Sequence, residues 1–180
     1  MSFESGKNMA SIGALFLVIG SFVPFLSLVG IILLLVGLRD LARYYNDDGI
    51  FQNALYAVIF GIIGIVAAGV LLVSLFLSGF AIGAGILLGV AGIIGALVVA
   101  FIFYIFMALY FRKTFDSLAD KSGQGMFRTA GLLLLIGAVL TIIIVGLVLI
   151  FVAWILATVA FFGMTPAKTA EQTPPPPPTQ

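Results

Sequence analysis

Charged residues are absent from three long stretches of the chain, which cover residues 8–38, 49–111 and 129–167. Each stretch is mostly apolar and exceeds the roughly 20 residues that a helix needs to cross a bilayer. The middle stretch is long enough for two such helices, and we expect its break at LSGF, residues 77–80. This pattern predicts an all-α fold, a polytopic transmembrane helical bundle.

The two outer stretches decide how many times the chain crosses the membrane. Pro24 interrupts the first stretch, and because proline kinks or ends a helix we expect a hairpin with helices near 8–23 and 26–45. The last stretch, 129–164, is long enough to tilt, to project or to fold back near Thr141, and we expect a single long helix there. The prediction is therefore about five spans, within a range of about four to six.

The charges gather in two islands, RDLARYYNDD at 39–48 and RKTFDSLADKSGQGMFR at 112–128. Apolar residues continue through both islands at helical spacing, which is typical of helices that leave a bilayer along its interface. Two spans separate the islands, and they are rich in Lys and Arg, so the positive-inside rule predicts that both are cytoplasmic faces of a cell-membrane protein. With five spans the N-terminus is also inside, and the C-terminal tail is outside.

The end of the chain, TPAKTAEQTPPPPPTQ, differs in composition from everything before it. Consecutive prolines favour an extended polyproline II conformation without a core. We therefore divide the chain into a transmembrane domain, 1–163, and a disordered proline-rich tail, 164–180. We interpret the tail as a solvated extension. The alternative is that the tail docks on an aromatic groove of a partner protein.

One short phrase occurs twice, as GIFQNA at 49–54 and as GMFRTA at 125–130. A shift of 76 residues therefore brings a repeated turn, Gly49 and Phe51, onto Gly125 and Phe127. Each copy predicts a turn at glycine, followed by an aromatic residue that lies at the level of the lipid headgroups. Two explanations of the match are open. One is an internal duplication, and the other is that two segments which re-enter a membrane need the same local residues.

Small residues recur at steps of three and four through the middle stretch. Such stripes let helix backbones approach closely in lipid, where packing rather than release of water drives association. We interpret this one as internal packing between two neighbouring helices, with an oligomer interface or a narrow pore as the alternatives. Its main members are Gly61, Gly64, Gly85, Gly89, Gly92 and Ala96.

The composition limits the kinds of ligand binding and catalysis that we expect of this protein. Hydrophobic residues make up 63% of the chain and charged residues 8%, and there is no His and no Cys. A net charge of +1 provides no basic surface for nucleic acid. The apolar stretches hold no ionisable acid or base of the kind that proton-coupled carriers and voltage sensors use. We expect no catalytic residue, no cofactor and no metal, and hence no enzyme.

Three segments of the sequence resemble a known family. They are the apolar run IGALFLVIGSFVPFLSLVG, the segment LRDLARYY where a helix leaves the membrane, and AFF at the end of the last apolar stretch. The family consists of small archaeal and bacterial membrane proteins and is catalogued as domain of unknown function 996; the resemblance covers about residues 5–163. It implies a compact multi-span protein and carries no activity or functional residue.

Two functions fit these observations. The first is a non-enzymatic bundle that lies in the lipid bilayer and associates with itself or with a membrane partner. The second is a carrier or pore for an uncharged or lipid-like solute.

Overall fold

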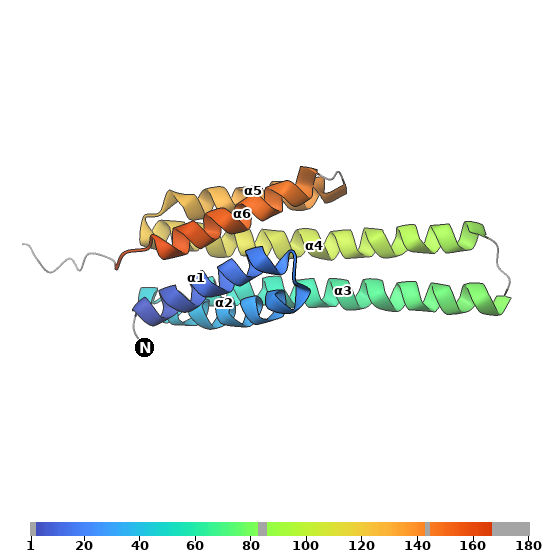
Figure 1. Ribbon diagram of the computed structural model, residues 1–180, viewed down its shortest axis with the longest axis horizontal. Coiled ribbons are helices and arrows are strands. Elements are labelled where there is room, and N and C mark those ends of the chain that lie inside the picture. The colour runs from blue at the N-terminus through green and yellow to red at the C-terminus, as the bar shows by residue number, and fades with distance from the viewer. Residues whose placement is uncertain (1–2, 83–85, 143–144, 167–180) are drawn as a thin grey trace, which may run out of the picture.

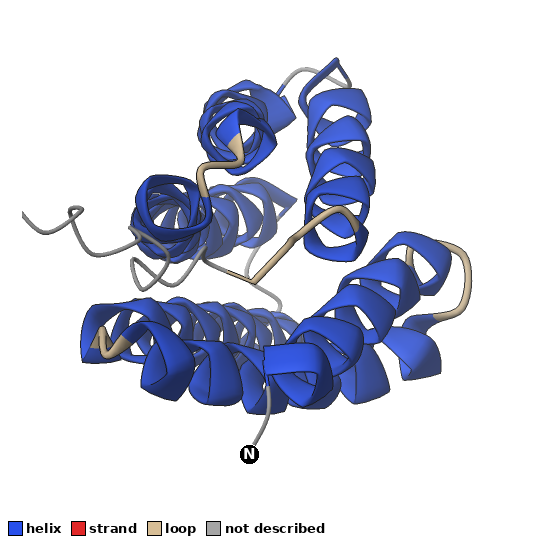
Figure 2. Cartoon of the chain, turned by 90° about the vertical axis from the view of Figure 1, so that its left-hand side faces the viewer, coloured by secondary structure: helices blue, strands red, loops and turns tan. Residues whose placement is uncertain are grey.

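The computed structural model describes residues 3–82, 86–142 and 145–166, and within them the side-chain surroundings except at 24, 77–82 and 86–89. This part of the chain contains no strand (Figure 2), so the all-α fold is confirmed. Five of its helices are long and apolar enough to cross a membrane, in agreement with the expected number of spans. The helices are α1 (Phe3–Gly20), α2 (Pro24–Tyr45), α3 (Asp48–Ile82), α4 (Ile86–Ser122), α5 (Gly125–Val139) and α6 (Val145–Phe162), with a short 3-10 helix η1 (Leu140–Ile142) after α5.

The helices form three antiparallel hairpins, α1–α2, α3–α4 and α5–α6 (Figure 1). The α3–α4 hairpin is long, and the other two are short and lie beside one half of it. α2 packs next to α3, α4 next to α5, and α1 next to α6, so the two short hairpins also touch each other. The start of α1, both charged islands and the end of α6 all lie at one end of the molecule.

Pro24 produces the expected hairpin and occupies the start of α2. Proline suits the first turn of a helix because the missing N–H has no partner there anyway. The backbone N–H groups of Ser21, Phe22 and Val23 bond to carbonyls of the last turn of α1, so the turn closes on itself.

Three expectations about the chain path were wrong. The last stretch is two helices, since α5 ends at Val139 and α6 runs back towards the charged islands. The end of α6 therefore lies on the same side as the start of α1, because six helices return the chain to where it began. The tail from residue 167 lies outside the described residues. The middle break is not at 77–80, because α3 continues to Ile82. Its Ser and Gly residues do not stop the helix, and glycine is common in membrane helices.

The buried core lies in the half of the molecule where all six helices overlap. Phe115 of α4 packs with Phe127 of α5 and with Phe161 of α6, with ring centroids 6.0 and 6.3 Å away. Trp154 meets Phe115 edge-on, at 6.0 Å. All three phenylalanine side chains are fully buried, and such contacts hold α5 and α6 against α4.

Glycine brings α1 and α2 into backbone contact. A Cβ atom at Gly13 would overlap the backbone of Leu34, and one at Gly37 would overlap the backbone nitrogen of Ala10. A Cβ at Gly30 would lie 2.8 Å from the carbonyl oxygen of Gly13, which is closer than side chains come. The packing of this hairpin therefore depends on the absence of side chains along the line of contact.

We predict that Gly37→Ala lowers the free energy of unfolding by about 1–3 kcal/mol, because the added methyl group forces α1 and α2 apart. Gly125→Ala is the matched control, since a Cβ there meets nothing within 4 Å. It should change stability by no more than about 1 kcal/mol, in the stabilising direction. Reversible unfolding of both variants in mixed micelles, followed by circular dichroism, checks this. Equal stability of the two variants would contradict the close approach.

Candidate functional site

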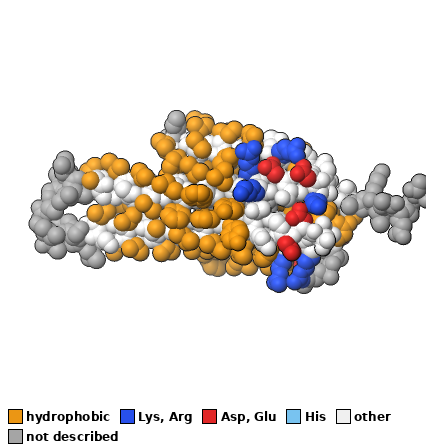
Figure 3. All heavy atoms as spheres, turned by 180° about the vertical axis from the view of Figure 1, so that it is seen from behind, with side chains coloured by type: hydrophobic (Ala, Val, Ile, Leu, Met, Phe, Trp, Pro, Cys, Tyr) orange, Lys and Arg blue, Asp and Glu red, His pale blue; other side chains and the backbone are white. Residues whose placement is uncertain are grey.

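The charged side chains of the described residues gather at one end of the molecule, and the surface beyond them is apolar (Figure 3). We call this region the charged end. It comprises the start of α1, the α2–α3 turn and the α4–α5 turn with the helix ends beside them. The charged side chains and most side-chain hydrogen bonds of the described residues lie here, so this end and the exposed faces of α3 and α4 are the candidate sites.

The α2–α3 turn is built by Asn46, which adopts a left-handed conformation with φ 51°. The N–H groups of Asn46 and Asp47 bond to carbonyls of the last turn of α2. The Asp47 carboxylate then accepts a bond of 3.0 Å from the N–H of Gly49, at the start of α3. Asn46 therefore ends one helix, and Asp47 helps to begin the next.

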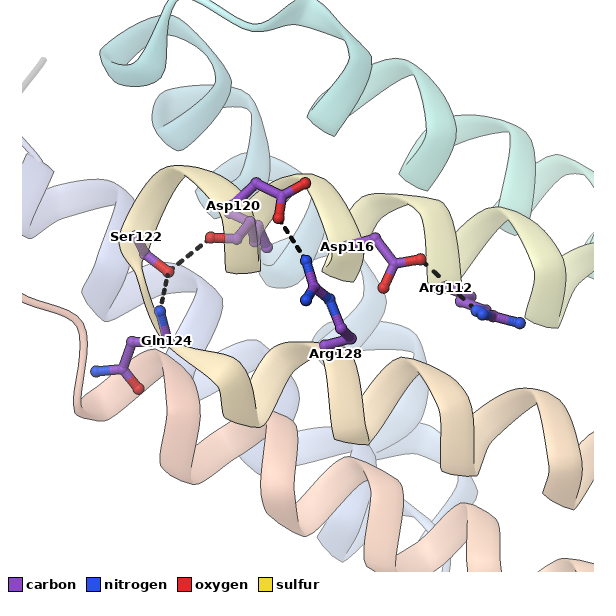
Figure 4. Close-up of polar contacts among 7 residues, drawn as sticks. Arg112, Asp116, Asp120, Ser122, Gln124 and Arg128 are labelled. Atoms are coloured by element: carbon purple, nitrogen blue, oxygen red, sulfur yellow. Dashed lines mark hydrogen bonds and ion pairs between the residues drawn. The ribbon is translucent and has the colours of Figure 1, made fainter.

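The α4–α5 turn uses the same physics with other residues (Figure 4). Gly123 takes the left-handed conformation, with φ 70°. The Ser122 hydroxyl donates to the Leu118 carbonyl at 2.6 Å and accepts from the N–H of Gln124 at 3.3 Å. The Gln124 side chain reaches the carbonyl oxygen of Gly163, just beyond α6, and so ties α6 to the start of α5.

The repeated residues Gly49 and Gly125 each lie in the first turn of a helix, and the left-handed residues precede them. The two phenylalanines differ in their surroundings, because the Phe51 ring has the Arg39 guanidinium 6.0 Å from its centroid, whereas Phe127 is fully buried. Both turns lie at the charged end, so the two copies run in the same direction along the bundle.

Ion pairs occupy the aspartates of the second island. Asp116 pairs with Arg112 at 3.6 Å, and Asp120 pairs with Arg128 at 2.6 Å (Figure 4). These side chains are well exposed, so each pair contributes no more than about 1 kcal/mol. Residues 3–82, 86–142 and 145–166 contain no group of three acidic or other metal-ligating side chains.

Two contacts fasten α4 to the start of α3 across the charged end. Lys121 lies 3.8 Å from the carboxylate of Asp47. The buried Thr114 hydroxyl lies 3.2 Å from the carbonyl of Tyr110 and 3.4 Å from the carbonyl of Ile50. This hydroxyl therefore links two helices that run through the whole molecule.

A tyrosine hydroxyl at the charged end is buried without a hydrogen-bond partner among the described residues. It belongs to Tyr45, whose ring packs edge-on against Tyr44 at 5.0 Å and against Phe3 at 6.4 Å. Asp40 is buried nearby on the same helix, where its Cβ faces Gly6. A buried hydroxyl without a partner costs free energy, so the aromatic packing outweighs it here.

The predicted small-residue stripe lies partly between α3 and α4. A Cβ at Gly61 would lie 2.9 Å from the Met107 sulfur, and one at Gly64 would lie 2.7 Å from Cβ of Phe103. On α4, Gly92 faces the side chain of Leu75, and Ala96 is buried. Each glycine thus receives a large side chain of the other helix. Gly85 and the surroundings of Gly89 lie outside the described residues.

The short hairpins pack against only one side of the long one. They cover Ile50 and Ala54 on α3 and Phe111 and Phe115 on α4, which are buried. No other described helix covers the other side of α3–α4. We call it the rear face; its residues follow from helical spacing around the Phe60–Phe106 stack and are Tyr56, Phe60, Ala67, Ala91, Gly95 and Phe106.

Sequence reasoning predicted the turns NDDG at 46–49 and KSGQG at 121–125 but missed three features: the left-handed conformation of Asn46 and Gly123 within them, the glycines that join α1 to α2, and the rear face. A signal existed for the second, because Gly6, Gly13 and Gly20 recur every seven residues, as do Gly30 and Gly37. A seven-residue period returns to nearly the same side of a helix. The rear face had no such signal, since both sides of α3 and α4 are apolar.

The fold and these surfaces define a class, a helical bundle with helices of membrane-spanning length and all described charges at one end. The chain belongs to the family described as "Protein of unknown function (DUF996)", whose model matches residues 26–155. The chain is 30% identical over 169 residues to the uncharacterized protein MJ1644 of Methanocaldococcus jannaschii, over 91% of this chain and 94% of that protein. The family resemblance of the sequence is thereby confirmed. No solved structure matches the chain.

We predict that Tyr45→Phe leaves the protein as stable as before or more stable by about 1 kcal/mol, because it removes a buried hydroxyl that lacks a partner. Tyr44→Phe is the control, since the Tyr44 side chain is 40% exposed. Unfolding in mixed micelles measures both. A clear loss of stability in Tyr45→Phe alone would show that this hydroxyl does bond to something.

Proposed function

We propose that this protein is a non-enzymatic structural component of the cell membrane that pairs with a second copy of itself through the rear face. The observation that carries the proposal is the one-sided packing of α3–α4. Both short hairpins lie against the same side of it, so no other described helix covers the opposite side of the two longest helices.

The composition of the rear face suits a protein partner better than lipid. Its half nearer the charged end carries partly exposed rings, with Tyr56 at 48% and Phe106 at 43%. Its other half carries Ala91 and Gly95, both exposed and four residues apart on one side of α4. Small residues at this spacing gain little from lipid chains and gain more when another helix backbone comes close.

A second copy is the occupant that we propose. Two chains related by a two-fold axis along the bundle would present the same rings and the same small residues to each other, which is the geometry of an isologous dimer. Four long helices would then form the centre, with the short hairpins outside. Both charged ends would lie on the same side of the membrane.

The test is Gly95→Leu, with Gly69→Leu as its matched control. A Cβ at either glycine meets nothing within 4 Å, so both variants should fold. Gly69 comes nine residues after Phe60, which turns it to the opposite side of α3 from the rear face. Energy transfer between donor-labelled and acceptor-labelled copies in liposomes, titrated against lipid, measures the pairing.

We expect Gly95→Leu to weaken pairing by about tenfold or more, which corresponds to about 1.4 kcal/mol, and Gly69→Leu to leave it unchanged. Equal pairing of wild type and Gly95→Leu would overturn the proposed interface. A monomeric wild type would show that lipid covers the rear face. Flux of a neutral solute through wild-type liposomes would favour the carrier instead.

We also propose that the charged end faces the cytoplasm, because the islands hold most of the Lys and Arg residues. The chain has no cysteine, so Ser122→Cys introduces a single thiol at that end. We expect a membrane-impermeant thiol reagent to label it in inside-out vesicles and to leave it unlabelled in intact cells. The reverse pattern would contradict this orientation.

A further inference from the structure

The charged end marks where the molecule meets one surface of the bilayer. A charged side chain in the hydrocarbon core is costly, and the described charges all lie at this end (Figure 3). On α4 the charges begin at Arg112, and the contact of Tyr110 with Tyr56 places residue 56 of α3 at about the same level. Beyond this level the described residues carry no charge and are mostly apolar, so this part of the molecule belongs in lipid.

The long hairpin has the length to cross the bilayer from that level. Residues 57–82 of α3 and residues 86–111 of α4 are each about 26 residues long, or about 39 Å at about 1.5 Å per residue. The hydrocarbon core is about 30 Å thick, and about 40–45 Å with the headgroup layers. With a modest tilt, α3 and α4 therefore reach the opposite surface.

Taken whole, the helices α2, α5 and α6 of the short hairpins are long and apolar enough to cross a membrane. The parts of α2 and α5 that lie beyond their charged residues do not have the length of the long hairpin. On the side of Arg39 that faces away from the charged end, α2 contributes residues 24–38, about 15 residues or about 22 Å. Below Arg128, α5 and η1 contribute residues 129–142, about 14 residues or about 21 Å on the same scale. Both values fall short of a core of about 30 Å, before any tilt is allowed for. Figure 1 shows both hairpins ending beside the middle of α3–α4.

The chemistry of the two ends agrees with a position inside lipid. Phe22 and Phe25 are 79% and 72% exposed at the α1–α2 turn, and Ile142 is 78% exposed at the end of η1. The hydroxyls of Ser21 and Thr141 bond back to carbonyls of their own helices. The turns at the charged end instead carry Asn, Asp, Lys and Gln, as turns in water do.

Backbone hydrogen bonding in the α1–α2 turn agrees with a position inside lipid. A chain that turns within hydrocarbon must satisfy its own N–H groups, because no water is present. In the α1–α2 turn the N–H groups of Ser21, Phe22 and Val23 bond to carbonyls of residues 18 and 19, and the next residue is a proline, which has no N–H. The N–H of Leu26 bonds to the carbonyl of Val23.

We infer that α1–α2 and α5–α6 are re-entrant hairpins that end inside the hydrocarbon core, so that the protein is a wedge. Six helices fill the leaflet on the charged side, and two helices continue through the other leaflet. The lipid surface that fits such a shape is one that curves outward on the charged side, because there the headgroups have more area and the opposite leaflet has less. This property is independent of pairing through the rear face.

The first experiment measures depth. Single cysteines at Phe22 and Ile142 in the full chain, labelled with an environment-sensitive dye, are quenched by lipids that carry a quencher at known depths in phosphatidylcholine–phosphatidylglycerol vesicles. We expect the strongest quenching from mid-chain quenchers at both positions, and at Ser122→Cys only from headgroup quenchers. Modification of Phe22→Cys by a water-soluble reagent, from the side opposite Ser122→Cys, would show a crossing hairpin and overturn the inference.

The second experiment measures preference for curvature in thin tubes pulled outward from giant vesicles of the same lipids. Ser122→Cys copies that face outward are labelled with an impermeant dye, and copies that face inward with a permeant dye of another colour, so the same chain serves as its own control. We expect about twofold or greater enrichment of outward-facing copies in the tube, and depletion of inward-facing copies. Equal sorting of the two orientations would overturn the wedge, even if the depth measurement agreed.

Discussion

The cost of placing a charge in hydrocarbon, about 2.5–3.5 kcal/mol per residue at the centre of a membrane helix, orders this molecule. It sends every described charged side chain to one end, and with them the two turns that need water or polar side chains. The far ends of the two short hairpins must then turn without such help. At the α1–α2 turn this is achieved by closing the backbone bonds locally and by a proline that has no N–H to satisfy.

Close packing follows from the same environment. Lipid offers no release of water to drive helices together, so contact area between helices has to supply the stability. The α1–α2 hairpin achieves this with glycine against backbone, as at Gly13 and Gly37. The α3–α4 hairpin uses a different solution, in which Gly64 receives Phe103 and Gly92 receives Leu75. The first solution suits short helices, which have little length over which to gather contacts.

Sequence reasoning predicted the features that depend on local chemistry. The α1–α2 hairpin follows from Pro24, and the helical extensions of α2 and α4 into the islands follow from periodicity. The sequence near Thr141 has no proline, charge or turn residue. It therefore does not distinguish a single long helix from a helix that folds back. A tertiary contact decides it, because Gly137 faces Gly146 so closely that neither position has room for a Cβ. The rear face also depends on tertiary packing, because it is the side of α3–α4 against which no other described helix lies. The sequence alone could therefore not predict it.

The repeated phrase acquires a physical explanation from its position. Its two copies match where the chain turns at the charged end, and the helices that follow them diverge, since α3 runs on to Ile82 whereas α5 stops at Val139. The matched residues also differ in their roles, as Phe51 faces Arg39 and Phe127 lies in the aromatic core. What the copies share is the task of starting a helix at a membrane surface. Shared local needs are sufficient to explain the similarity at the turns, whereas a duplication would have to explain in addition why the two helices came to differ in length.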